Sequence, residues 1–444
     1  MNRNRANKKR TGGASARVLS PVAAGMLAAA LCFQPMTALA GPAGDSSLTS
    51  SSSNAGPGGG SGSSNSGSTG SSGGSTSVSN GSVSAVTSGL GVYRVTENEG
   101  IGAIARGVDV SYWQQNVNWS QVASDNVQFA MLATRFRGNV DPFFAMNAAN
   151  ASQAGLRLGA YIYSYATSVE MAQQEADFVL NLIKDYPISF PVVFDAEDAN
   201  TLGTLTQSQV SDVINAFCKR IQDAGYYPMV YANEYWIANK IDMSKISYDI
   251  WVAKYQQKYT YSKTSMWQAS NTGSVKGVNG NVDIDYLYKD YTQIIPGNTW
   301  RTIAGNRYYY QNHVMQKAAW INDGQNWYYM NAAGNPSTGW LELSGKKYYL
   351  EADGHMITGW KTLDGGWRYF DASGEQATGW RAVDGSWYFM ADNGLMQTGW
   401  LETGGKKYYL NASGAMQAGW QNLGGSWYYF DGSGAMTTGW QAVG

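Results

Sequence analysis

Two carboxylates stand two residues apart at the end of an apolar run in the segment FPVVFDAED. Asp195 and Glu197 follow Val192–Phe194, which we expect to be a buried strand. Because side chains alternate across a strand, these two carboxylates point to the same face. Cleavage of a glycosidic bond needs one group that gives a proton to the leaving oxygen and a second that stabilises the positive sugar ring. A carboxylate pair on one face can supply both.

Two more acids are candidates for the same site. Asp109, in GVDVSYWQ, ends the first predicted strand of this region, and Asp283, in NVDIDYLY, lies in the last. In a closed barrel the first and last strands are neighbours, so all four acids would meet at one rim. Crowded like charges raise the pKa of at least one carboxyl group, and a proton donor at neutral pH requires that. We therefore predict a catalytic cluster of Glu197, Asp195, Asp109 and Asp283.

The elements that would carry these acids lie between residues 106 and 291, where short β-rich runs alternate with helical patterns or loops. The predicted strands are ARGVDVS, QFAMLATRF, RLGAYIYSY, FPVVFDAE, YPMVYANEY, DIWVAKY, SMWQAS and VDIDYLY. Strands that alternate with helices favour a parallel sheet, and eight strands can close a barrel. The last three strands are separated by loops with little helical pattern. The fold class is therefore α/β, a TIM-like (β/α) barrel with an incomplete ring of helices.

Two of the intervening helices have clear start signals. Thr167 and Glu170 form a predicted capping box before MAQQEADFVLNLIKDY, and Thr206 and Gln209 form a second one before VSDVINAFCKRIQDAG. Cys218 lies in the second pattern, and as a small apolar residue it fits a core position better than a nucleophile.

The beginning of the chain has a different composition. Residues 1–40 combine six basic residues and no acid with a short apolar run, which is typical of a secretory signal peptide cleaved after Ala40. Residues 41–91 are mostly Ser, Gly, Asn and Thr and predict a disordered linker. The barrel would then occupy residues 92–293. Without the leader, 25 basic residues stand against 32 acidic ones, a net charge of about −7.

The remaining residues, 294–444, have a strict period of about twenty. The tryptophans in register are Trp300, Trp320, Trp340, Trp360, Trp380, Trp400, Trp420 and Trp440. Each unit reads as an aromatic strand, a Gly turn, a second aromatic strand and another Gly turn, which is a β-hairpin. A lone hairpin is not stable, so the units are expected to stack into an all-β solenoid.

The ordered segments RGVDVSYWQQNVNW, GAYIYSYA, VVFDAED, MVYANEYW, WVAKY, MWQAS and VDIDYLY resemble the family 25 glycoside hydrolases, lysozymes of the Chalaropsis type, over residues 104–291. The resemblance implies a muramidase that cleaves the β-1,4 bond between N-acetylmuramic acid and N-acetylglucosamine. It makes Glu197 the general acid. Asp195 would be its partner, either as a nucleophile or by orienting the substrate's own acetamido group, with Asp109 and Asp283 completing the acidic floor. Asp285 stands where an Asn is common.

Aromatic residues at strand ends could stack on sugar rings. Tyr163, Tyr231 and Trp267 are the candidate substrate-binding residues, and packing in the barrel is the alternative for each. Trp113 and Trp119 are expected to be structural.

The repeats resemble choline-binding, or cell-wall-binding, repeats, in which a ligand sits between successive hairpins in an aromatic cage that is often closed by Met. The candidate wall-ligand residues are Trp327, Trp340, Trp360, Trp367, Trp380, Trp387, Trp400, Trp420 and Trp427. Aromatic faces attract a quaternary ammonium group, whereas Lys347 and Lys407, which replace Trp in two units, would repel it. We therefore expect complete cages at only some junctions, with wall-linked choline or another wall glycan as the ligand.

The expected partner of the barrel is the glycan strands of peptidoglycan, and the expected location is outside the cell, on the bacterial wall. Because such walls are usually anionic, net charge would not hold an acidic protein there, so specific sites must. No metal cluster, phosphate loop or basic stripe occurs in the sequence. We expect no cofactor, no metal, no nucleic acid and, after leader cleavage, no membrane. Two alternatives stay open: a non-catalytic wall-binding protein or adhesin, and a hydrolase of another acetamido glycan.

Overall fold

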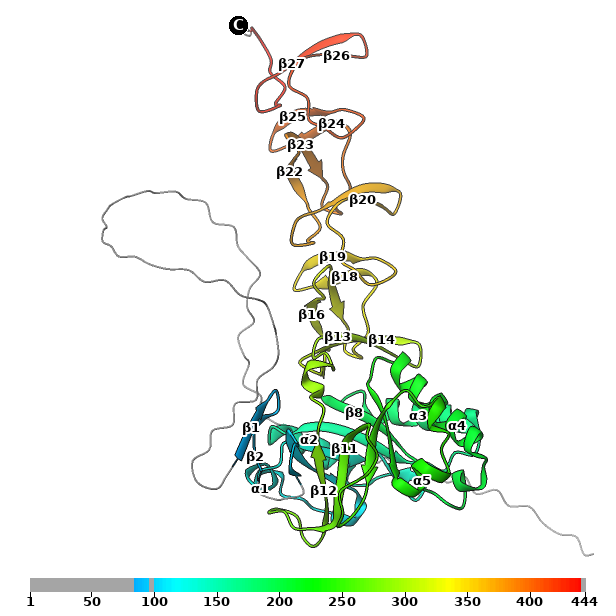
Figure 1. Ribbon diagram of the computed structural model, residues 1–444. Helices are drawn as coiled ribbons and strands as arrows, with labels where there is room; N and C mark the ends of the chain where they lie inside the picture. The colour runs from blue at the N-terminus through cyan, green and yellow to red at the C-terminus, as the bar shows by residue number, and fades with distance from the viewer. Residues whose placement is uncertain (1–83, 96–99, 441–444) are drawn as a thin grey trace, which may run out of the picture. The chain divides into compact units, whose positions relative to one another are not determined.

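The computed structural model describes residues 84–95 and 100–440 (Figure 1). The predicted leader, 1–40, and the greater part of the predicted linker lie outside the described residues. The first described element is the antiparallel hairpin of β1 (Ser84–Ser88) and β2 (Gly91–Val95), which begins inside the stretch predicted to be linker. Among the described residues, none of the helices has the length and apolar character needed to cross a membrane.

Eight strands close into a barrel in the order β10-β11-β12-β3-β4-β7-β8-β9. Their bounds are β3 (Ala105–Val110), β4 (Phe129–Ala133), β7 (Arg157–Tyr163), β8 (Ile188–Asp195), β9 (Pro228–Asn233), β10 (Asp249–Ala253), β11 (Thr264–Gly273) and β12 (Val282–Leu287). Each coincides with one of the eight predicted runs, so the predicted barrel is confirmed.

The expectation of a parallel sheet is wrong at one strand. β12 pairs antiparallel with both of its neighbours, β11 and β3, whereas the other pairings around the barrel are parallel. A parallel connection needs a crossover of a dozen or more residues. The chain between Gly273 and Val282 is shorter than that, so it can only turn back beside the strand it leaves.

The outer ring of helices is incomplete, as predicted. The α-helices are α1 (Trp119–Ser124), α2 (Phe144–Gln153), α3 (Val169–Ile183), α4 (Gln207–Asp223) and α5 (Glu234–Asn239), and they follow β3, β4, β7, β8 and β9 in turn. Among the described residues, no α-helix follows β10 or β11. Short 3-10 turns, η2 (Tyr112–Gln114), η3 (Leu202–Thr204), η4 (Met243–Lys245) and η5 (Tyr291–Gln293), and the small hairpin of β5 (Arg135–Phe136) and β6 (Asn139–Val140) complete the connections.

One of the two predicted helix starts is confirmed and the other is displaced by one residue. Thr206 and Gln209 form the capping box of α4, each side chain bonding to the other's backbone N–H. At α3 the cap is Ser168, whose hydroxyl accepts from the Met171 N–H at 3.3 Å, and not Thr167. Both hydroxyls suit a cap, and the extended backbone of Ser168 decides between them.

Two apolar layers hold the barrel together. The strand residues that point outward pack against the helices, and Cys218 of α4 is buried there, as expected. The residues that point inward fill the barrel below its mouth, where Phe129 stacks on Phe190 with ring centroids 5.1 Å apart. Gly107 on β3 gives Phe129 its space, because a Cβ at this position would lie 2.2 Å from the ring.

The repeat region is a series of antiparallel two-stranded hairpins, extended in the first by a third short strand (Figure 1). The strands are β13 (Thr299–Ile303), β14 (Asn306–Gln311), β15 (Val314–Met315), β16 (Ala319–Asn322), β17 (Trp327–Met330), β18 (Gly339–Leu343), β19 (Lys346–Leu350), β20 (Gly359–Leu363), β21 (Gly366–Phe370), β22 (Gly379–Val383), β23 (Ser386–Met390), β24 (Gly399–Thr403), β25 (Lys406–Leu410), β26 (Gly419–Leu423) and β27 (Ser426–Phe430). The last residue of each second strand from β17 to β27 is fully buried or nearly so. The predicted hairpin solenoid is confirmed.

Gly107→Ala tests the packing of the barrel interior. The added methyl group would overlap the buried ring of Phe129, which cannot move without disturbing Phe190. We expect the free energy of unfolding of the barrel to fall by about 1–3 kcal/mol, measured by denaturant titration. Gly432→Ala is the matched control, since no atom lies within 4 Å of a Cβ at that position. Equal unfolding midpoints for both variants would contradict the packing described.

Candidate active site

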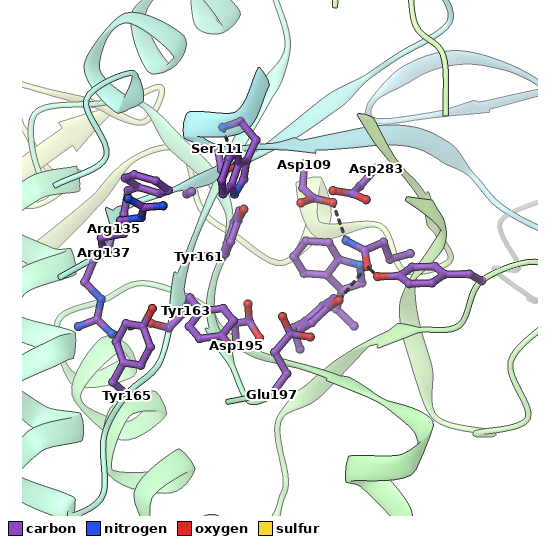
Figure 2. A pocket seen from close by; sticks show the side chains of 17 residues that line it. Asp109, Ser111, Arg135, Arg137, Tyr161, Tyr163, Tyr165, Asp195, Glu197 and Asp283 are labelled. Carbon is purple, nitrogen blue, oxygen red and sulfur yellow. Dashed lines mark hydrogen bonds between the residues drawn. The ribbon is translucent and has the colours of Figure 1, made fainter. Parts of the chain in front are cut away.

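A cavity of about 410 Å³ opens at the carboxyl ends of the parallel strands (Figure 2). It is lined by Asp109, Ser111, Trp113, Ala133, Arg135, Phe136, Arg137, Tyr161, Tyr163, Tyr165, Asp195, Glu197, Tyr231, Trp251, Tyr255, Gln268 and Asp283.

All four predicted acids line this cavity. Asp195 is the last residue of β8, and Glu197 follows it by two. Asp109 on β3 stands directly opposite Asp283 on β12 in the antiparallel register. The reversal of β12 is what makes this meeting possible, because Asp283 is near the start of its strand and would lie at the far end of the barrel if β12 ran parallel.

Burial keeps protons on this cluster. It raises the pKa of Asp109 well above its usual value, and the charges of Asp283 and Asp285 add to the effect. Burial, followed by the charge of Glu197, likewise raises the pKa of Asp195 well above its usual value. The pKa of Glu197 is raised by burial and then by Asp283 and Asp198, and burial raises the pKa of Asp283 to about 6. The cluster therefore supplies a protonated carboxyl group near neutral pH.

A glutamine that sequence analysis missed orients Asp109. Gln268 on β11 donates from Nε2 to Asp109 Oδ2 at 2.7 Å. Its Oε1 accepts from the hydroxyl groups of Tyr231 and Tyr255, each at 2.8 Å. Because two hydroxyl donors hold Oε1, the amide N–H group is left facing the carboxylate. Hydrogen bonds of this kind favour the ionised form of Asp109 and oppose the effect of burial on its pKa.

Asp285 lies deeper in the barrel than the cavity-lining acids. Its side chain is fully buried, and Oδ1 accepts from Trp251 Nε1 at 3.0 Å. Oδ2 has no hydrogen-bond partner among the described residues. Burial, and next the charge of Asp283, raise the pKa of Asp285 well above its usual value. The residue that departs from the common Asn is thus a buried carboxyl group beneath the site, and burial favours its neutral form.

Two of the three predicted sugar-binding aromatics line the cavity. Tyr163 donates its hydroxyl hydrogen to Asp198 Oδ2 at 3.1 Å, and Tyr231 belongs to the Gln268 network. Trp267 does not line the cavity. It is buried on the outer face of the barrel, where Nε1 donates to the Lys254 carbonyl oxygen at 2.9 Å. The next residue of β11, Gln268, is the one that faces inward, because side chains alternate along a strand.

The expectation for Trp113 is also wrong. It lines the cavity and is 67% exposed, against the rings of Tyr112 and Phe136. Trp119 is buried and structural, as expected, and its indole N–H donates to Asn147. Trp113 and Trp119 occur in similar sequence contexts, and only the position of η2 at the barrel mouth distinguishes them.

Two arginines, Arg135 and Arg137, line the end of the cavity away from the four acids (Figure 2). Sequence analysis did not identify either one. Both belong to the short hairpin β5–β6. Arg135 lies inside the predicted strand QFAMLATRF and Arg137 directly follows it, and neither position indicates a site.

The second candidate site lies between repeats. Trp360, Trp367, Tyr388 and Met396 surround a cavity of about 330 Å³. The rings of Trp360 and Tyr388 meet edge to face with centroids 4.8 Å apart, and the Met396 N–H donates to the Trp367 carbonyl oxygen at 2.8 Å. One cage thus combines two residues of one hairpin with residues contributed from farther along the chain. The equivalent contacts join Trp320, Trp327, Tyr348 and Met356, and also Trp380, Trp387, Tyr408 and Met416.

Three junctions lack the complete set, the first of them because Arg307 takes the place of the second Trp beside Trp300. Lys407 takes the place of the second Trp beside Trp400, and Lys347 takes it beside Trp340. At Trp340 the guanidinium group of Arg368 also lies over the indole ring, 5.0 Å from its centroid, and Arg368 is only 7% exposed. The protein's own cation therefore occupies the face of Trp340 that a ligand cation would use.

The comparisons with known proteins agree with these two sites. The model of the glycosyl hydrolases family 25 matches residues 108–278. The choline-binding repeat model matches residues 337–378 and 377–418, and the putative cell wall binding repeat model matches 319–335 and 418–436.

Two of the similar proteins each match 40% of this chain. An uncharacterized protein of Escherichia coli, YegX, is 31% identical over 189 residues, which cover 40% of this chain and 68% of that protein. Lysozyme M1 of Streptomyces globisporus is 30% identical over 195 residues, 40% of this chain and 66% of that protein. Among solved structures, choline binding protein F from Streptococcus pneumoniae is 31% identical with a TM-score of 0.30, over 39% of this chain and 64% of that one. The chain thus spans less than two thirds of that structure.

Asp285→Asn tests the buried neutral carboxyl group. A carboxyl group with a raised folded-state pKa stabilises the fold below its unfolded pKa, and this contribution is lost as pH rises through the folded pKa. Asn keeps an acceptor for Trp251 and does not titrate. We expect the Tm of the variant to match that of the parent near pH 3.5 and to exceed it by roughly a few degrees at pH 8.

The control is Asp212→Asn, which removes an exposed carboxylate on α4 that pairs with Lys245. Its Tm should stay near that of the parent at each pH, because exposed ion pairs contribute little. A Tm difference for Asp285→Asn that does not change with pH would contradict the assignment.

Proposed function

Since the chain belongs to the glycosyl hydrolases family 25, we propose that it is a secreted muramidase held on the bacterial wall by its repeats. It cleaves the β-1,4 bond between N-acetylmuramic acid and N-acetylglucosamine in peptidoglycan. The observation that carries this proposal is the group of four acids with raised pKa values at one end of a barrel cavity. The name of a relative, Lysozyme M1, supports it.

Glu197 is the proton donor in this proposal. Its carboxyl group lines the cavity, where a substrate can reach it, and burial together with Asp283 raises its pKa. A general acid must hold its proton at the working pH and still give it up to the leaving oxygen. Glu197 combines access and a raised pKa, and every mechanism for this bond requires such a group.

Asp195 acts as the partner that orients the acetamido group of the substrate. The Asp195 side chain lines the cavity, and its Oδ1, which is buried, has no hydrogen-bond partner among the described residues. An acetamido N–H could donate to this carboxylate, which would direct the carbonyl oxygen of the same group at the anomeric carbon. Asp195 must be ionised for this step, so the proton that the adjacent Asp195 and Glu197 carboxyl groups share must reside on Glu197, against the stronger effect of burial on the pKa of Asp195.

Asp109 and Asp283 form the acidic floor beneath the reacting ring, and the hydrogen bond from Gln268 favours the ionised form of Asp109 there. A positive charge develops on the sugar in the transition state, and fixed acidic groups in a cavity with little water stabilise it. Gln268 fixes the direction of Asp109 toward the cavity.

Two other functions compete with this one. A non-catalytic wall-binding protein or adhesin would have no use for four converging acids, whose burial is costly. A hydrolase of another acetamido glycan would have the same acids, so the two functions are distinguished by the sugar at the reducing end of the product. Muramidase cleavage leaves a reducing N-acetylmuramic acid, whereas cleavage of chitin leaves a reducing N-acetylglucosamine.

Wall attachment through choline is the second part of the proposal. The choline-binding repeat models match this region, and three junctions of the described repeats have the complete aromatic and Met set. Electron-rich rings around a small cavity attract a quaternary ammonium group. The predicted leader, residues 1–40, would bring the chain to the outside of the cell.

Glu197→Gln tests the proton donor. The amide keeps the shape of the side chain but cannot donate an acidic proton, so we expect release of reducing sugar from purified peptidoglycan to fall by roughly 10²–10⁴-fold with an unchanged fold. Glu170→Gln, on the exposed first turn of α3, is the control and should keep full activity. A Glu197→Gln variant that digests walls as fast as the parent would end the assignment.

Trp387→Ala and Trp340→Ala together test the cages. Trp387 belongs to a complete cage, whereas the face of Trp340 is covered by Arg368. We expect the full chain carrying Trp387→Ala to bind choline-containing walls more weakly and to elute at a lower concentration of free choline. Trp340→Ala should elute with the parent. Elution of all three proteins at the same choline concentration would show that these rings serve only as solenoid core.

A further inference from the structure

The cavity of the barrel is divided by charge. The four acids lie on one side of it, and Arg135 and Arg137 lie on the other (Figure 2). A site that only needed to stabilise a positive transition state would not need cations in the same cavity. The presence of Arg135 and Arg137 in this cavity therefore requires its own explanation.

Arg135 is a structural residue. It forms an ion pair with Glu175 at 2.6 Å, and it also donates to the Tyr163 carbonyl oxygen. Its guanidinium group covers the ring of Tyr165, and its side chain is only 12% exposed. Its charge is already neutralised by Glu175, so it offers little to a ligand.

Arg137 differs from Arg135 in each of these respects. It is exposed, and among the described residues no carboxylate forms an ion pair with it. Its guanidinium group lies over the ring of Phe136, 5.1 Å from the centroid, and Phe136 in turn stacks on Tyr112 at 4.0 Å. Aromatic rings thus support the cation without neutralising it.

The backbone of Arg137 is in a conformation that few residues adopt. Arg137 has φ 49° and Gly138 has φ 82°, and the two form the loop between β5 and β6. A two-residue hairpin loop with both φ values positive is a type I′ turn, in which Asn, Asp or Gly is preferred. Arg at this position costs stability relative to Asn. A charged residue held at that cost on the wall of a cavity indicates a role in binding.

We propose that Arg137 binds a carboxylate carried by the glycan and so selects peptidoglycan over neutral acetamido glycans. The inference rests on the proposed function. Muramic acid carries a lactyl ether whose carboxyl group is either free or extended by a peptide with carboxylates of its own, whereas chitin carries no charge. The guanidinium fork matches a carboxylate, and the exposed ring of Trp113 beside Phe136 gives the adjoining sugar a surface to stack on.

Arg137→Asn is the decisive variant, because Asn suits the turn and removes the charge. On soluble peptidoglycan fragments we expect KM to rise about tenfold with kcat unchanged. Arg137→Lys should recover part of this loss, since it restores the charge but not the fork. The second substrate is the same fragments with their carboxyl groups converted to amides, on which parent and Arg137→Asn should have equal kcat/KM.

A third substrate locates the carboxylate. Fragments from which the peptides have been removed enzymatically keep only the free lactyl carboxylate. If the advantage of the parent over Arg137→Asn persists on them, Arg137 binds the lactyl group; if it disappears there but is present on intact fragments, Arg137 binds the peptide.

Equal kcat/KM for the parent and Arg137→Asn on intact fragments would overturn the proposal, as would an unchanged difference after amidation. Both results leave the muramidase assignment standing. That assignment fails separately, if the parent releases no reducing N-acetylmuramic acid from any of the three substrates.

Discussion

The antiparallel pairing of β12 with β3 is the constraint on which the site depends. It places Asp283 opposite Asp109, although the two residues lie at opposite ends of the barrel sequence. The connection after β11 is too short for a crossover, so the last strand runs backward and its start reaches the catalytic end. Asp109, Tyr163 and Asp195 come from the carboxyl ends of parallel strands, whereas Asp283 comes from the beginning of β12. The acidic floor follows from this one reversal, and burial raises the pKa values of its two carboxyl groups.

Burying the acidic floor costs free energy, and the residues around it offset only part of that cost. Burying several carboxyl groups together disfavours their ionised forms, and the barrel offers them few compensating donors. Gln268, held by Tyr231 and Tyr255, donates to Asp109, and Trp251 donates to Asp285. The remaining compensation is protonation itself. The site is therefore less stable at higher pH for the same reason that it can donate a proton near neutral pH.

Much of this could be predicted from the sequence, and the errors share a cause. Apolar runs identified the eight strands. Asp195 and Glu197 both line the cavity because they stand at and just after the carboxyl end of β8. Trp267 and Gln268 are adjacent in β11 and therefore point to opposite faces of the barrel wall. The prediction chose Trp267 for the cavity, whereas Gln268 is the residue that faces it. Arg137 acts through a turn whose neighbours come from other segments, so its sequence context carried no signal. Local periodicity specifies elements, but contacts across the barrel decide which side chains reach the cavity.

The repeats offer a means of attachment to an anionic wall that does not depend on the net charge of the chain. Without the predicted leader, residues 1–40, the chain would have a net charge of about −7 and would gain nothing from an anionic surface. Each complete cage is a small, neutral aromatic cavity, and cation–π attraction to one exposed ligand is modest. If the cages bind choline as proposed, several of them on one chain act at high effective concentration, which would turn modest sites into firm attachment. Arg368, Lys347 and Lys407 fill or weaken the cages at their own junctions. In the proposed function, single residues within an otherwise uniform repeat therefore set the number of working cages.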